Sequence, residues 1–131
     1  MASVRYIVND VEAAMAFYCD NFGFKTVYHP ADTFAEVVRD DLHLLLSAPR
    51  GLGAGSQPMP DGRQLEPGGW NRISLEFPDN LEEVVAGLQA KGYPFRSEEL
   101  ITGVGGTLII MDDPSGNPVE LFRHNPQPQQ P

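Results

Sequence analysis

Three histidines, one cysteine and eighteen acidic residues are the side chains of this chain best suited to chemistry. Their spacing matches no common catalytic motif: the sequence has no His-x-x-x-His, no cysteine pair, no Gly-Lys-Ser/Thr and no Gly-x-Ser-x-Gly. Adjacent acidic residues, such as Asp40-Asp41 and Asp112-Asp113, are typical of turns or solvated faces. We therefore predict no catalytic residue and no cofactor.

The composition is that of an ordinary globular domain of 131 residues, 41% hydrophobic and 21% charged. A net charge of −9 argues against general nucleic-acid binding and mildly favours neutral or cationic ligands. No apolar run approaches the roughly eighteen residues of a membrane helix. The first ten residues lack the pattern of a secretory signal, and the single Cys19 fits a reducing compartment, so we expect a cytoplasmic protein.

Two segments of the chain have the same order of predicted elements. In the first, Asp10 is the expected cap of a helix that ends at Gly23. In the second, Asp79 or Asn80 is the expected cap of a helix that ends before Gly92. A strand is predicted before each helix. These strands and helices are Val4–Val8, Val11–Phe22, Ile73–Phe77 and Leu81–Lys91.

Three further strands follow each helix, so each half is predicted to be βαβββ. The turn sequences between them leave strands at about 25–28, 33–39, 42–47, 95–100, 107–111 and 119–123. The predicted organisation is a first module (1–48), a Gly/Pro-rich loop (49–69), a second module (70–124) and a disordered Pro/Gln-rich tail (125–131). A loop of this length is either functional, as a lid over a site, or a flexible linker.

Alternation along the strands gives each half one apolar face and one mixed face. Val4, Tyr6 and Val8 point to one side of the first strand, whereas Ser3 and Arg5 point to the other. The apolar faces should lie under the two helices, and the mixed faces should line solvent or a concave site. We therefore predict an α+β fold in which two βαβββ modules form a curved mixed sheet shaped as a cup.

Three stretches of the chain match the motifs of a known family. They are Val8-Asn9-Asp10 with Ala13-Ala14 and Phe17-Tyr18, then Phe22-Gly23-Phe24, and finally Asp113-Pro114-Ser115-Gly116-Asn117-Pro118-Val119-Glu120-Leu121. With these motifs the chain resembles the vicinal oxygen chelate superfamily, which includes glyoxalase I, extradiol dioxygenases and bleomycin-resistance proteins. The resemblance implies two βαβββ modules that pair into a cup, commonly in a dimer whose subunits share sites.

The resemblance also identifies four positions at which metal-dependent members hold their ligands. Glu120 matches, but Ser3 and Arg72 stand where the family has His or a similar ligand, and Leu45 stands where it has Glu. Leucine cannot bind a metal, and a guanidinium has no free lone pair. We therefore expect no metal site, and an ion pair between Arg72 and Glu120. His43 shares the predicted face of Leu45; it is either half of a metal site with Glu120 or a polar residue on a partly wet face.

Aromatic and apolar side chains near the expected cup predict a site for a flat molecule. Trp70 precedes the first strand of the second module, at the expected mouth; the alternative is that it is a packing residue. Stacking on such a ring contributes roughly 0.5–1.5 kcal/mol beyond burial. The predicted ligand-binding residues are Trp70, Arg72, Glu120, Phe34, His43, Leu45, Ser3, Arg5, Met59 and Phe122.

A cup with these linings, and without a metal or nucleophile, resembles the bleomycin-resistance branch of the superfamily. The resemblance implies a non-catalytic protein that binds an aromatic antibiotic and confers resistance by sequestration. The alternative is a metal-dependent or metal-free enzyme of the glyoxalase or dioxygenase type, a lyase, isomerase or oxygenase; in the metal-free case Arg72 and Glu120 would act on a small substrate. The expected partners are a small aromatic molecule and a second copy of the chain, because pairing would cover exposed sheet edges. We expect neither nucleic acid nor membrane as a partner.

Overall fold

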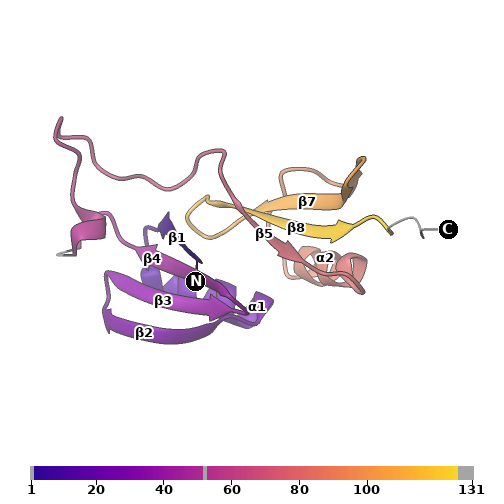
Figure 1. The fold of residues 1–131 in the computed structure, drawn as a ribbon, viewed down its shortest axis with the longest axis horizontal. Helices are drawn as coiled ribbons and strands as arrows, with labels where there is room; N and C mark the ends of the chain where they lie inside the picture. The colour runs from indigo at the N-terminus through magenta and orange to yellow at the C-terminus, as the bar shows by residue number, and fades with distance from the viewer. Residues whose placement is uncertain (1, 52, 127–131) are drawn as a thin grey trace. The chain divides into compact units, whose positions relative to one another are not determined.

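The structure, a computed structural model, describes residues 2–51 and 53–126 and has an α+β fold (Figure 1). Two βαβββ modules follow one another, as the sequence predicts. Of the expected disordered tail, residues 127–131 lie outside the described range. The elements are β1 (Ala2–Ile7), α1 (Val11–Phe22), β2 (Lys25–Ala31), β3 (Phe34–Arg39), β4 (Leu42–Ser47), the 3-10 helix η1 (Ala54–Ser56), β5 (Ile73–Glu76), α2 (Leu81–Ala90), β6 (Ile101–Thr102), β7 (Gly106–Asp112) and β8 (Pro118–His124).

The chain divides into two compact units. Unit 1 runs to Trp70 and also includes the turn Asp113–Asn117, which connects β7 to β8. Unit 2 contains Asn71–Asp112 and the chain from Pro118 onward. No helix within the described residues is long and apolar enough to cross a membrane.

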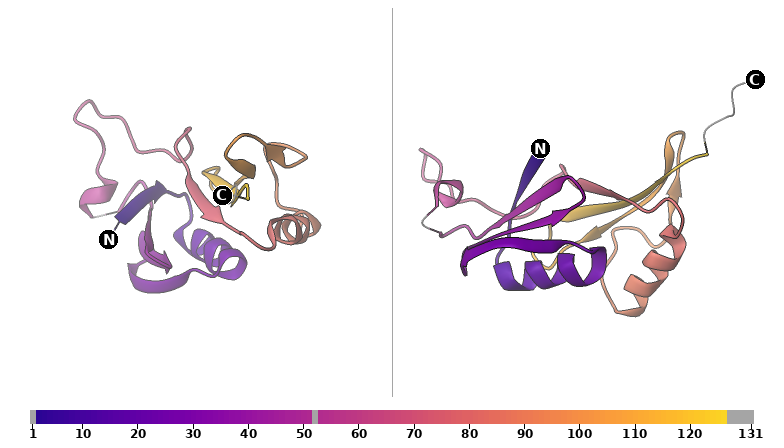
Figure 2. Two further views of the ribbon diagram at one scale, coloured as in Figure 1. Left: turned by 45° about the vertical axis from the view of Figure 1, so that its right-hand side comes forward. Right: turned by 60° about the horizontal axis from the view of Figure 1, so that its bottom comes forward.

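The sheet of unit 1 has the strand order β1-β4-β3-β2. β1 runs parallel to β4, whereas the other neighbours are antiparallel, so the sheet is mixed. α1 lies along one face of this sheet (Figure 2). Tyr6 and Val8 are buried on the helix-covered side and Arg5 is exposed, which confirms the predicted alternation along the first strand.

α1 has the predicted bounds because the sequence supplies a cap at each end. The side chain of Asp10 accepts a hydrogen bond from the backbone N–H of Ala13 at 3.0 Å. Gly23 ends the helix in the left-handed conformation, at φ 74°, and its N–H donates to the carbonyl of Tyr18. Between the caps, Phe17 and Tyr18 make an edge-to-face ring pair, with centroids 5.0 Å apart, in the core under the sheet.

The sheet of unit 2 repeats this arrangement with the order β5-β8-β7-β6, and α2 packs against β8. The cap of α2 is Asn80, without a side-chain hydrogen bond, and the helix ends at Ala90. Arg123 of β8 donates to both carboxylate oxygens of Glu82 at 2.6 Å. The hydrogen bonds from Arg123 hold the pKa of Glu82 below its usual range.

The predicted strand at 95–100 is wrong. Phe95 makes only an isolated bridge with Met111, and the regular pairing begins at the two-residue strand β6. Pro94 cannot donate to a ladder, and the following Arg-Ser-Glu-Glu has low strand propensity. The segment therefore crosses the sheet edge without pairing along its length.

Candidate functional site

The sheet face of unit 1 opposite α1, hereafter the open face, holds five predicted site residues. Strand pairing places Ser3 beside His43, and Arg5 beside Leu45. Phe34 lies on β3, where its strand partner is Ser47. Ser3, Arg5, Phe34, His43 and Leu45 are thus brought together on one surface.

His43 is closely paired on the open face with a residue that the sequence interpretation missed. Its Nδ1 lies 2.5 Å from Oε2 of Glu36, and each side chain is 23% exposed. Glu36 pairs with Leu45 across the strands, so its side chain points to the same side. The signal was present in the sequence: in Phe34-Ala35-Glu36-Val37-Val38 the small and apolar residues Ala35 and Val37 alternate with a carboxylate.

Arg5 connects the open face with the inter-module loop. Its Nη1 donates to Oγ of Ser47 at 2.7 Å. Its guanidinium also packs against Gly55 of η1, so closely that a Cβ at Gly55 would overlap it. A glycine at this position therefore lets part of the loop lie against the guanidinium of Arg5.

In unit 2, Arg72 and Glu120 form the predicted ion pair. Nε of Arg72 donates to Oε1 of Glu120 at 2.9 Å, and the side chains are 31% and 15% exposed. Oγ of Ser74, which is paired with Glu120 across β5 and β8, donates to Oε2 at 2.9 Å. Both carboxylate oxygens therefore accept a hydrogen bond from the protein.

These residues do not fit a metal ion at the positions where the resemblance implies one. Arg72 offers no lone pair and brings a positive charge to the one carboxylate that matches the family. Leu45 has no donor atom, and Ser3 offers only a neutral hydroxyl. Within residues 2–51 and 53–126, no three His, Cys, Asp or Glu side chains are grouped closely enough to hold a metal.

The predicted aromatic walls each have a ring neighbour in their own unit. Phe34 makes an edge-to-face contact with Tyr28 of β2, with centroids 6.2 Å apart. Phe122 of β8 makes a similar contact with His124, with centroids 4.5 Å apart. Gly106 lies beside Phe122, where a Cβ would overlap the carbonyl of Arg123.

Trp70 and Met59 belong to the loop between the modules. Trp70 is 87% exposed, which does not support the alternative that it is a packing residue of the core. Met59 is 41% exposed and lines a shallow hollow of about 530 Å³, with Arg63, Gln64 and Glu66. Neither residue lies in a strand.

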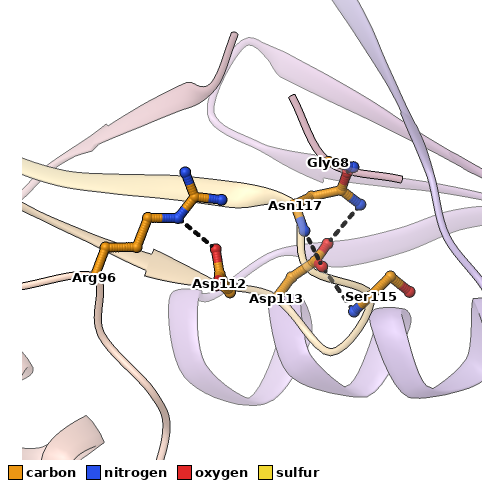
Figure 3. A network of polar contacts seen from close by, with 6 residues as sticks. All are labelled: Gly68, Arg96, Asp112, Asp113, Ser115 and Asn117. Carbon is orange, nitrogen blue, oxygen red and sulfur yellow. Dashed lines mark hydrogen bonds and ion pairs between the residues drawn. The ribbon is translucent and has the colours of Figure 1, made fainter. Parts of the chain in front are cut away.

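The turn Asp113–Asn117 of unit 1 carries a network of polar contacts (Figure 3), which the sequence interpretation missed. The buried carboxylate of Asp113 accepts from the hydroxyl of Tyr18 at 2.8 Å and from the backbone N–H groups of Ser115 and Asn117 at 2.9 Å. Burial, followed by the charge of Asp113, raises the pKa of Tyr18 far above its usual range. Of the two alternatives for Asp112-Asp113, a turn or a solvated face, the structure shows the turn, and Asp113 is buried in it at 4% exposed.

Asn117 extends this network to two other segments. Its Nδ2 donates to the carbonyl of Ile7 at 2.8 Å and to the Asp113 carboxylate at 3.1 Å. Its Oδ1 accepts from the N–H of Gly68 at 2.7 Å. The turn sequence therefore serves the fold, because it connects the end of β1 with the end of the inter-module loop.

Two βαβββ modules with mixed sheets define the class of this protein as a two-module α+β chain. The sequence profile of the Glyoxalase/Bleomycin resistance protein/Dioxygenase superfamily matches residues 1–121, and the chain belongs to this superfamily. No curated protein matches the chain significantly.

Solved structures of the same fold include both binding proteins and enzymes. A superfamily member from Sphaerobacter thermophilus is 28% identical, with a TM-score of 0.72 over 95% of this chain and 96% of that one. Lactoylglutathione lyase from Agrobacterium tumefaciens is 23% identical, with a TM-score of 0.71 over 94% and 92%. TnmS3, an antibiotic binding protein from Streptomyces sp. CB03234, is 22% identical, with a TM-score of 0.68 over 94% and 93%.

Proposed function

We propose that this protein binds an aromatic small molecule, such as an antibiotic, and confers resistance by sequestration without transforming it. The observation that carries this proposal is the ion pair of Arg72 with Glu120, supplemented by Ser74. Glu120 is the one carboxylate that matches the metal ligands of the family, and both its oxygens already accept hydrogen bonds from the protein. Sequestration requires affinity alone, which a surface of rings, apolar side chains and a few polar groups can supply.

The side chains available for binding support a flat ligand. Trp70 presents an almost fully exposed indole, and Phe34 and Phe122 lie on sheet faces opposite the helices. A ring stacked on Trp70 would gain roughly 0.5–1.5 kcal/mol beyond the burial of its area. The likeness to an antibiotic binding protein is in keeping with this proposal.

An enzyme is the second candidate, and the close contact between His43 and Glu36 is the observation that favours it. A histidine oriented by a carboxylate is a common arrangement for proton transfer. A metal-free lyase or isomerase could use this pair, whereas a metal-dependent one lacks suitable residues at the family positions. The likeness to a lyase shows that the fold is compatible with catalysis.

We also propose that the protein is a cytoplasmic homodimer. Every residue of the edge strand β2 is exposed, including Val27 at 58% and Tyr28 at 57%. An edge strand with exposed apolar side chains is a surface that pairing would protect. Sedimentation should give a particle of twice the chain mass at micromolar concentration, and a monomer there would contradict this proposal.

The test of function combines binding, metal content and turnover. Protein purified without chelators is analysed for Zn, Ni, Mn and Fe, and a panel of planar antibiotics is screened by thermal shift and tryptophan quenching. A ligand at a hundredfold over its Kd should stabilise the protein by about 2.7 kcal/mol. Recovery of the ligand unchanged after incubation supports sequestration. A stoichiometric metal or a converted ligand would establish the enzyme instead.

Trp70→Ala should weaken binding of such a ligand by about 1–3 kcal/mol, or roughly five- to a hundred-and-fifty-fold in Kd. Trp70→Phe is the matched control, because it keeps a stacking ring and should retain most of the affinity. Equal affinity of the Ala variant and the wild type, with unchanged tryptophan emission, would remove Trp70 from the site.

A further inference from the structure

The contact between Glu36 and His43 fixes which ring nitrogen of His43 carries the proton. An ionised carboxylate can only accept hydrogen bonds, so Nδ1, at 2.5 Å from Oε2 of Glu36, must be the donor. In the neutral imidazole, Nε2 then presents a lone pair. Nε2 has no protein partner in the part of the chain that the structure describes. The open face therefore carries an oriented hydrogen-bond acceptor.

The surroundings of this acceptor are apolar and aromatic. Phe34 lies two residues before Glu36 on β3, so their side chains share one face. Tyr28 is the strand partner of Glu36 on β2, is 57% exposed, and contacts the ring of Phe34. On the other neighbouring strand, β4, the partner of Glu36 is Leu45, whose side chain points to the same face. A ring surface thus lies on the same face as one polar group that accepts a hydrogen bond.

The charges on this face favour a neutral donor over an anion. The Glu36 carboxylate repels anionic groups near His43. Of the cations on this face, Arg5 is separated from Glu36 by Leu45 and is bonded to Ser47, and Lys25 is separated from His43 by Val38. Ser3 is the neighbour of His43 on β1 and can donate or accept. A hydroxyl attached to a ring combines the apolar body and the donor that such a surface requires.

We propose that the open face of unit 1 binds a planar aromatic ligand through a hydroxyl, phenolic or enolic, that donates to Nε2 of His43 while the ring lies against Phe34 and Tyr28. Glu36 is the positioning residue, since it holds the proton on Nδ1. This inference rests on the proposed binding function and adds the chemical class of the ligand.

The first test compares 2-hydroxyanthraquinone with its methyl ether, which has the same ring but no donor. The wild type should bind the hydroxyl compound about tenfold more tightly, the ratio expected for one hydrogen bond to a partly buried acceptor. His43→Leu should reduce the ratio to about one and leave the affinity for the methyl ether unchanged. His29→Leu, at an exposed position on β2, is the matched control and should keep the ratio.

The second test uses Glu36→Gln, which keeps the imidazole and removes the carboxylate. NMR of the imidazole nitrogens should find the proton on Nδ1 of His43 in the wild type. In the variant the amide can also donate, so the proton should be shared between the two nitrogens and the preference for the hydroxyl compound should fall. A proton found on Nε2 in the wild type would overturn the proposal.

The outcomes separate this inference from the proposed function. If both quinones bind with equal affinity, or if neither binds while another planar antibiotic does, the role of His43 is wrong and the binding function stands. If no member of the panel binds, both are wrong.

Discussion

Replacing Asn117 tests the role assigned to the turn network, because this side chain connects three segments of unit 1. Asn117→Ala removes the hydrogen bonds to the carbonyl of Ile7, to the Asp113 carboxylate and from the N–H of Gly68, of 2.8, 3.1 and 2.7 Å. Asn117 is 2% exposed, so water cannot freely replace its amide.

The magnitude follows from which partners are left without a hydrogen bond. Asp113 keeps three other donors, including Tyr18, and Gly68 is exposed enough to bind water. The carbonyl of Ile7 loses its side-chain donor in a partly buried place. With about 1 kcal/mol for each lost bond and partial recovery at Gly68, the free energy of unfolding should fall by about 2–3 kcal/mol. Asn117→Asp should lower the free energy of unfolding further, by about 3–5 kcal/mol, because it places a second buried carboxylate beside that of Asp113.

Urea unfolding measures this directly, as a shift of the midpoint at an unchanged m-value. Asn125→Ala is the matched control: its amide also donates to two backbone carbonyls, of Gly103 and Val104 at 3.0 Å, but on an exposed loop. That variant should lose less than about 1 kcal/mol. Equal losses for the two variants would refute the structural importance of the network.

Three further predictions concern stability. A double-mutant cycle with Arg72→Met and Glu120→Gln should give a coupling of about 1–2 kcal/mol, between the values for exposed and buried pairs; a coupling near zero would contradict the ion pair. The pKa of Tyr18 is raised from 10.0 in the folded protein, so above pH 10 only the unfolded chain ionises this residue. The free energy of unfolding should therefore keep the full contribution of Tyr18 below pH 10 and fall above pH 10 by up to about 1.4 kcal/mol per pH unit. Tyr18→Phe should reduce the alkaline slope of the free energy of unfolding by the amount that one proton contributes, and an unchanged slope would contradict the raised pKa of Tyr18. Gly106→Ala should cost about 1–3 kcal/mol because its Cβ would overlap the carbonyl of Arg123, and a neutral substitution would show that β7 can shift.

Much of the fold could be predicted from the sequence because its signals are local. The cap at Asp10, the left-handed position at Gly23 and the periodicity between them define α1 with its observed bounds. The turn residues Asp40-Asp41 mark the start of β4, which has the predicted bounds Leu42–Ser47. The failed strand at 95–100 shows where local signals end, since the segment makes one isolated bridge at Phe95 and one backbone hydrogen bond from Arg96 to Ile110, and no continuous ladder.

The candidate site was only half predictable, because the sequence shows which residues are present and not which are paired. The pair of Arg72 and Glu120 could be inferred from the family positions that the two residues occupy. The pair of Glu36 and His43 could not, since it depends on the register of β3 against β4. A shift of one residue in that register would turn one of the two side chains toward α1.

The sequence by itself determined the two βαβββ modules, the apolar faces under the helices and the loss of the family's metal donors. The first two features follow from the order and periodicity of the residues, and the third from the resemblance to the family together with the chemical type of the residues at its ligand positions. Only the tertiary structure decided that the Asp113–Asn117 turn belongs to unit 1, and that the Glu36 carboxylate lies beside Nδ1 of His43. The physical reason is distance along the chain: Asn117 and Ile7 are 110 residues apart, and a hydrogen bond between them exists only after the backbone has brought them together.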